Sequence, residues 1–175
     1  MYFKVAEAES FTVTLPLPTT TVKRKDMDIG ILIDSSSGVT DDEFRFLKSF
    51  ILQLVKSIHK KFSNVQFGIV AYSNKPDLVM PLQKVDRIKV KSIIEGVKYN
   101  PGGHRTDLAM LLASQKLFCP KGCDDRPEVE NVLIVFTSGK TDAESLPYNL
   151  VSPMMKVSES TCLTNNTIQN GSDTL

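Results

Sequence analysis

The stretch DIGILIDSSSGV, residues 28–39, determines the kind of fold that this chain adopts. Residues 27–33 form a short, nearly continuous apolar run, which is typical of a parallel strand covered on both faces. The run ends at Asp34, and three serines and a glycine follow it. An aspartate at the exit of a buried strand, followed by Ser-x-Ser, indicates a place where a divalent cation could bind.

Helix and hairpin signals follow this first strand. Thr40 and Glu43 have the spacing of a capping box, which predicts the start of a helix with one apolar stripe. Residues 65–73 and 77–83 are predicted to be two strands of an antiparallel hairpin. Pro81 indicates that the second of these strands lies at the edge of the sheet.

The second half of the chain repeats the alternation of helix and strand. A helix is predicted over roughly residues 86–97, and another from a cap at Thr106 to Phe118. Residues 131–137, NVLIVFT, are the most apolar strand of all. Together these elements predict an α/β fold, a three-layer α/β/α sandwich whose sheet is mostly parallel with one antiparallel edge strand.

Composition changes divide the chain into three parts. Residues 1–25 contain Thr and Pro and are interpreted as an extended linker, and residues 26–157 form the domain. Residues 158–175 are polar and without periodicity, which predicts a disordered tail.

Overall composition excludes some classes of partner. The 175 residues, 41% of them hydrophobic, suffice for one core of ordinary size. A net charge of +1 gives no general attraction to nucleic acid or anionic lipid. No apolar run reaches the roughly 18 residues that span a membrane, and the first residues lack the apolar segment of a secretory signal. Lys84, Arg87 and Lys91 recur at helical spacing, as a heparin-like patch or simply as a solvated helix face.

The three cysteines cannot all pair within one chain. Cys119 and Cys123 flank Pro-Lys-Gly, a turn-forming insert that could bring their sulfur atoms close enough for a disulfide. A zinc site would need further ligands from Cys162, His59 and His104, whose spacing is irregular. Zinc is therefore not favoured, and Cys162 would be left over.

Polar residues gather at the predicted carboxyl ends of the strands. Asp34, the turn 102–106 and Ser138 are far apart in the sequence, but all three are expected to fall at this edge of the sheet. In α/β sheets, ligands bind at this edge. The expected convergence of these residues is the strongest functional signal in the sequence.

Three separated motifs, in the right order, resemble the von Willebrand factor type A domain, also called the integrin I-domain. They are DIGILIDSSSGV, PGGHRTDLAM (101–110) and NVLIVFTSGKTD (131–142). The resemblance covers about residues 26–157, and the stretch 119–127 is most similar to extracellular-matrix members of the collagen VI, matrilin and coadhesin kinds. It implies a non-enzymatic, extracellular module for cell adhesion. It also implies two more strands and two helices after residue 157, so the domain is expected to be truncated at its C-terminal end. The apolar strand 131–137 would then have an open edge, which favours self-association. The implied partners are collagens or other matrix proteins.

The resemblance also implies a metal-ion-dependent adhesion site, from which this sequence departs. Asp34 and Ser36 match the family's Asp-x-Ser-x-Ser, but Gly38 stands at the second serine. His104 replaces a threonine ligand, and Ser138 replaces a second aspartate. Mg²⁺ prefers oxygen ligands, and a neutral imidazole is a poor substitute. The site is therefore expected to be degenerate, with Mg²⁺ binding weak or lost and no other cofactor.

The same residues are expected to form a ligand-binding rim. This rim consists of the two metal-site residues that match the family and of Ser37, Gly38, His104, Thr106 and Ser138. Asn165 and Asn170 lie in Asn-x-Ser/Thr sequons and are candidates for N-glycosylation if the chain enters the secretory pathway.

Two alternatives remain open. The chain could be a structural unit of a larger matrix filament, with its contacts elsewhere on the surface. It could also be a degenerate phosphohydrolase that uses Asp34, although Ser36 stands where that chemistry requires a second aspartate. A serine hydrolase is not favoured, because serines 35–37 lie in no Gly-x-Ser-x-Gly motif. A Ser36/His104 pair would also lack an orienting carboxylate in the sequence pattern.

Overall fold

The structure is a computed structural model that describes residues 26–119, 122–151 and 159–164. The predictions made for residues 1–25, Asn165 and Asn170 lie outside the described residues. The strands are β1 (Met27–Asp34), β2 (Val65–Tyr72), β3 (Pro76–Gln83), β4 (Glu130–Thr137) and β5 (Glu159–Thr164). The helices are α1 (Asp41–Lys61), α2 (Arg87–Gly96), α3 (Thr106–Lys116) and α4 (Tyr148–Val151).

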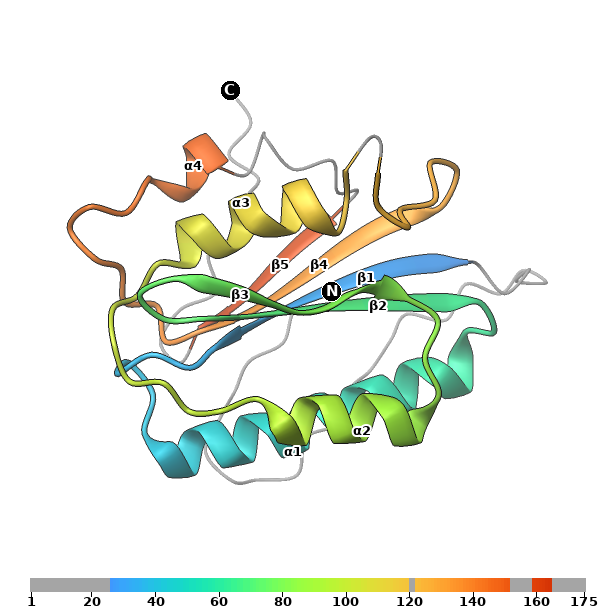
Figure 1. Ribbon diagram of the computed structural model, residues 1–175, viewed down its shortest axis with the longest axis horizontal. Helices are drawn as coiled ribbons and strands as arrows, with labels where there is room; N and C mark the ends of the chain where they lie inside the picture. Colours follow the sequence, from blue (N-terminus) through green and yellow to red (C-terminus); the bar gives the residue numbers. More distant parts are fainter. Residues whose placement is uncertain (1–25, 120–121, 152–158, 165–175) are drawn as a thin grey trace.

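The strands form one five-stranded sheet in the order β3-β2-β1-β4-β5. β1 pairs in parallel with β2 and β4, β4 pairs in parallel with β5, and β2 and β3 are antiparallel. Helices α1 and α2 cover one face of the sheet, and α3 and α4 lie on the other (Figure 1). The predicted three-layer sandwich with an antiparallel edge strand is thus confirmed.

The alternation of side chains along β1 explains why both faces of the sheet are covered. Ile29, Ile31 and Ile33 belong to the core beneath α1 and α2, whereas Leu32 belongs to the core beneath α3. All four side chains are at most 1% exposed. A central parallel strand buried on both faces reads as a continuous apolar run, and this is the pattern found in residues 27–33.

The helix starts were predicted with mixed success. The capping box of α1 is confirmed, because the Glu43 N–H donates to the Thr40 hydroxyl and the Glu43 carboxylate accepts from the Thr40 N–H. Asp86 caps α2 by accepting from the Lys89 N–H at 2.7 Å. The prediction that Thr106 caps the next helix is wrong, since Thr106 is its first helical residue and Arg105 precedes it without a side-chain cap.

The prediction of a disordered tail over residues 158–175 is wrong for residues 159–164. These residues form β5, which pairs with β4 from Val132↔Glu159 to Thr137↔Thr164. β4 therefore has a neighbour on both sides, and the predicted open edge of residues 131–137 is wrong as well. The sequence ESTCLT is too polar to show the apolar run of a buried strand, but an edge strand needs only backbone pairing on one side.

A buried ion pair ties the loop before β4 to the start of β1. Asp28 is fully buried, and it accepts hydrogen bonds from the Arg126 backbone N–H (3.1 Å) and from Arg126 Nε (2.9 Å). The Arg126 guanidinium also donates to the carbonyls of Met27 and Asn64.

Cys119 and Cys123 are joined by a disulfide in the connection between α3 and β4. No helix in the described part of the chain is long and apolar enough to cross a membrane.

Candidate functional site

Three loops meet at the carboxyl ends of the parallel strands. They are residues 34–40 after β1, residues 100–106 before α3 and residues 138–142 after β4, and they lie together on the left in Figure 1. We call these loops the rim. A hydrogen bond from the Ser37 hydroxyl to the Gly102 carbonyl (2.8 Å) joins the first loop to the second. The predicted convergence of distant residues therefore occurs in the structure.

The Asp34 carboxylate joins the first loop to the third. Its Oδ1 accepts from the Ser36 N–H and its Oδ2 accepts from the Ser138 N–H, both at 2.9 Å. Asp34 is only 1% exposed. Both oxygens therefore satisfy backbone donors, and the carboxylate stabilises the loop arrangement itself.

The serines after Asp34 are also engaged in local hydrogen bonds. Ser36 is fully buried, and its hydroxyl accepts from the Gly38 N–H at 3.2 Å. The Ser35 hydroxyl donates to the Tyr72 carbonyl at 2.9 Å. Ser37 is the exposed serine of this loop. Of the three serines, Ser37 is thus the one that solvent can reach.

Gly38, His104 and Ser138 pack directly against one another. A Cβ atom placed on Gly38 would lie 2.2 Å from Ser138 Oγ and 2.9 Å from His104 Cδ2. The φ angle of Gly38 is not positive, so lack of space rather than backbone conformation favours glycine here. Ser138 Oγ and His104 Nε2 are buried and have no hydrogen-bond partner among the described residues.

Asp142 is a rim residue that sequence reasoning missed. Its Oδ2 accepts from the His104 backbone N–H at 2.8 Å, and its Oδ1 lies 3.1 Å from His104 Nδ1. Because a carboxylate only accepts, Nδ1 carries the proton in this pair. The hydrogen bonds from the His104 backbone and ring lower the pKa of Asp142. No periodicity or motif links the two residues, which are 38 positions apart.

Thr106, the last residue of the second rim loop, is buried beneath the surface of the rim. It is 1% exposed, and its hydroxyl donates to the Tyr72 hydroxyl, which in turn donates to the Phe136 carbonyl. Asp107, its neighbour, is buried and is bound by the Arg105 guanidinium through two hydrogen bonds of 2.9 Å. Burial raises the pKa of Asp107, but the hydrogen bonds from Arg105 and from backbone N–H groups outweigh this effect and lower it.

The donor set of the rim fits Mg²⁺ poorly. Mg²⁺ needs near-octahedral oxygen ligands, whereas Gly38 supplies no side-chain oxygen and His104 supplies a nitrogen. Both Asp34 oxygens already accept backbone hydrogen bonds. Across the described residues, no group of three or more His, Cys, Asp or Glu side chains is placed to hold a metal ion. The residues of the rim therefore do not fit a Mg²⁺ ion.

Comparison with known proteins decides the family. The family model of the von Willebrand factor type A domain matches residues 28–165, which include all three loops of the rim and β5. The chain belongs to the von Willebrand factor type A domain family. This confirms the resemblance stated from the sequence, and the match reaches beyond the domain boundary expected at residue 157.

Several relatives of this von Willebrand A domain are matrix or adhesion proteins by name. It is 32% identical to matrilin-1 of Gallus gallus over 117 residues, which are 66% of this chain and 23% of that protein. It is 29% identical to the collagen alpha-6(VI) chain of Mus musculus, covering 69% of this chain and 5% of the collagen chain. Integrin alpha-X of Homo sapiens is 26% identical, covering 82% of this chain and 12% of the integrin chain. The chain therefore spans between 5% and 23% of the length of these relatives.

A solved structure with the same fold is that of proximal thread matrix protein 1 from the mussel byssus. It superposes with a TM-score of 0.66 at 22% identity, over 80% of this chain and 37% of that chain. This likeness supports the fold assignment.

Proposed function

We propose that this von Willebrand A domain is a non-enzymatic, extracellular protein-binding module that binds collagens or other matrix proteins through its rim. Relatives named matrilin, collagen and integrin support a role in the matrix and in adhesion. The disulfide between Cys119 and Cys123 is consistent with an oxidising, extracellular location.

The proposal includes binding that does not depend on a metal ion. The observation that carries it is the packing of Gly38 against Ser138 and His104, where a Cβ atom would lie 2.2 Å from Ser138 Oγ. The side chains of Ser138 and His104 thus occupy the space that a serine side chain at position 38 would need. Because the remaining carboxylate, Asp34, is bound by two backbone N–H groups, the degenerate site holds itself together without a cation.

The two alternatives are less well supported. A phosphohydrolase would need Asp34 as an accessible nucleophile, but Asp34 is 1% exposed and both of its oxygens accept hydrogen bonds. A structural unit of a larger filament would use contacts outside the rim. Rim substitutions would then leave its binding unchanged.

The test is a solid-phase binding assay on immobilised collagens and other matrix proteins. Ser37→Arg places a long, charged side chain on the rim, and Ser63→Arg is the matched control at an exposed serine before β2, at the opposite end of the sheet. We expect binding that persists in EDTA, is lost in Ser37→Arg and is retained in Ser63→Arg. Loss of binding in EDTA would refute the metal-independent site. Equal binding by both variants would favour the filament alternative, and turnover of generic phosphate esters would favour the phosphohydrolase.

A further inference from the structure

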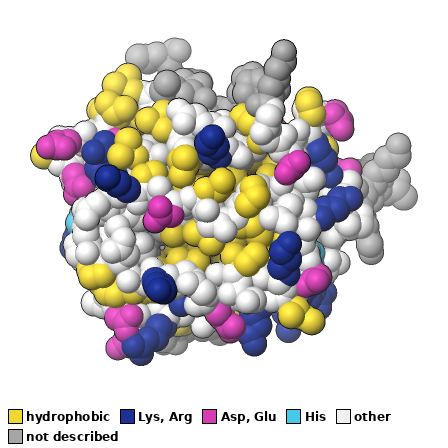
Figure 2. Space-filling model, viewed as in Figure 1, with side chains coloured by type: hydrophobic (Ala, Val, Ile, Leu, Met, Phe, Trp, Pro, Cys, Tyr) yellow, Lys and Arg dark blue, Asp and Glu magenta, His cyan; other side chains and the backbone are white. Residues whose placement is uncertain are grey.

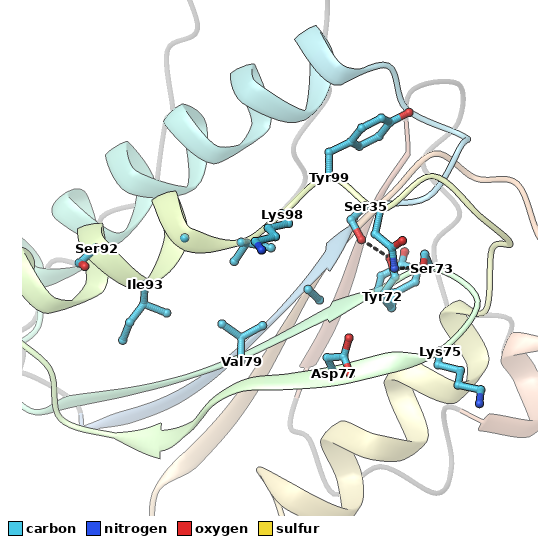
Figure 3. Close-up of a pocket in the computed structure, with 14 residues that line it drawn as sticks. Ser35, Tyr72, Ser73, Lys75, Asp77, Val79, Ser92, Ile93, Lys98 and Tyr99 are labelled. Carbon is cyan, nitrogen blue, oxygen red and sulfur yellow. Dashed lines mark hydrogen bonds between the residues drawn. The ribbon is translucent and has the colours of Figure 1, made fainter.

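A groove of about 620 Å³ lies between α2 and β3, on the face that α1 and α2 cover. Its walls come from α2, from the residues that follow α2 and from the ends of β2 and β3 (Figure 3). It is lined near the rim by Ser35, Ser73 and Asn100. Ser35 and Asn100 belong to the rim loops, but the rest of the lining lies outside them, so the groove adjoins the rim and extends away from it.

The floor of the groove is apolar. Ile93 from α2 and Val79 from β3 point toward one another across it (Figure 3), and both are only partly buried. Figure 2, in the same view as Figure 1, shows hydrophobic side chains gathered at the middle of the molecule, with both basic and acidic side chains around them. This face therefore offers apolar area to a partner.

The margin of the groove is basic. Lys75 lies where β3 begins and Lys98 follows α2; both are exposed, and no carboxylate among the described residues pairs with either. Asp77 is the one acidic side chain in the lining. Outside the lining, α2 and the residues before it carry three more exposed cations, Lys84, Arg87 and Lys89, while Lys91 pairs with Glu95.

The acidic groups of the α2 segment are already used. Asp86 caps the helix, and Glu95 lies 3.7 Å from the Lys91 ammonium. The charges left without an opposite partner near the groove are therefore mostly positive. They complement an anionic ligand and would attract it more strongly at low ionic strength.

We propose that this groove binds an extended acidic segment of a partner protein. Apolar side chains of the segment pack on Ile93 and Val79, and its carboxylates lie at Lys98 and Lys75. The apolar floor favours a peptide over a sulfated polysaccharide, which has no hydrophobic side chain to place there. The surface adjoins the rim, but its apolar floor and basic margin come from residues outside the rim loops.

The experiment uses the full chain and fluorescence polarisation with a labelled peptide of alternating Glu and Leu. A Lys/Leu peptide, a Glu-only peptide and a heparin oligosaccharide serve as competitors. We expect the Glu/Leu peptide to bind, with affinity falling as salt is raised, and the Lys/Leu peptide not to compete. Lys98→Gln and Lys75→Gln should each weaken binding about two- to fivefold, as expected for exposed charge pairs. Asp77→Asn, which removes the opposing charge, should strengthen it by a similar factor.

Controls make the outcome specific to the groove. Lys116→Gln removes an exposed lysine from α3 on the other face and should leave the affinity unchanged. Ile93→Ser should weaken the Glu/Leu peptide more than the Glu-only peptide, provided that a thermal melt shows the variant folded. Equal losses in Lys98→Gln and Lys116→Gln would overturn the proposal. The proposal would also be overturned if the Glu/Leu peptide did not bind the parent chain while heparin bound Ile93→Ser with full affinity.

Discussion

The Asp142 carboxylate holds His104 at two atoms, the backbone N–H at 2.8 Å and the ring Nδ1 at 3.1 Å. One side chain thus fixes both the turn before α3 and the orientation of the imidazole. The other ring nitrogen, Nε2, is buried next to the position where Gly38 meets Ser138. The packing of the rim therefore depends on a residue that is not at any of the family's metal-site positions.

Asp142→Asn is expected to destabilise the fold near neutral pH and to flatten its acid dependence. The pKa of Asp142 is lowered in the folded state, so its contribution is fully present above the unfolded value, about pH 4, and is lost as the pH falls through the lower folded value. The measurement is urea denaturation over a pH series. Glu128→Gln, at an exposed carboxylate, is the control, and an identical pH profile in both variants would contradict the role of Asp142.

Gly38→Ala should lower the free energy of unfolding by about 1–3 kcal/mol, because the added methyl overlaps Ser138 and His104. Since φ at this glycine is not positive, the cost is one of space and should be recoverable. Adding Ser138→Gly removes the nearest overlapping atoms, so the double variant should be more stable than the sum of the two single effects predicts. Denaturant titration of the four proteins gives this coupling. Strict additivity would show that the Gly38 cost arises elsewhere.

Arg126→Gln should destabilise the domain more than loss of the disulfide does. It leaves the fully buried Asp28 without its cation, and breaking a buried pair in this way costs about 3–5 kcal/mol. The bond between Cys119 and Cys123 closes a loop with a sequence separation of only 4, for which the chain-entropy estimate is about 2 kcal/mol. Thermal and urea unfolding of Arg126→Gln and of the double Cys→Ser variant give the ranking. The reverse ranking would contradict it.

The sequence predicted the elements whose signals are local. The apolar runs of β1 and β4 and the capping box of α1 lie within a few neighbouring residues, and each was read correctly. Alternation of helix and strand then predicted the layers and the meeting of the rim loops. These steps need only periodicity and the rule that parallel strands end at one edge.

The features that were missed depend on partners far away in the chain. In the sequence, Asp28 is simply a polar residue at the start of a predicted strand. Only the fold brings Arg126, which is 98 positions away, to its carboxylate oxygens. Asp142 likewise meets His104 across 38 positions. β5 was missed because its polar sequence gains its order from pairing with β4, a contact that no periodicity within six residues can reveal.

The last prediction concerns recovery of metal binding. Gly38→Ser, His104→Thr and Ser138→Asp together restore the oxygen ligands of the family's metal site, and His104→Thr also removes the ring that lies 2.9 Å from the Gly38 Cβ position. The new carboxylate would stand near Asp34, because Asp34 already accepts from the backbone N–H of residue 138. At a few ångströms the attraction of each carboxylate for a cation is several kcal/mol at an effective dielectric of about 20, so the aspartate should contribute most.

Two measurements test this recovery. In Mn²⁺ calorimetry we expect no resolvable heat for the parent chain and binding in the sub-millimolar to millimolar range for the triple variant. Without metal, the repulsion between the two carboxylates should lower the melting temperature of the variant, and Mn²⁺ should raise it again while leaving the parent unchanged. Ser138→Asp alone is the control, because it adds the charge but neither of the two hydroxyl ligands. Tight Mn²⁺ binding by the parent would refute the degenerate site. A folded triple variant that does not bind Mn²⁺ would show that restoring the oxygen atoms does not restore their geometry, since His104→Thr removes the ring contact with Asp142 and leaves only the backbone N–H of residue 104 to hold it.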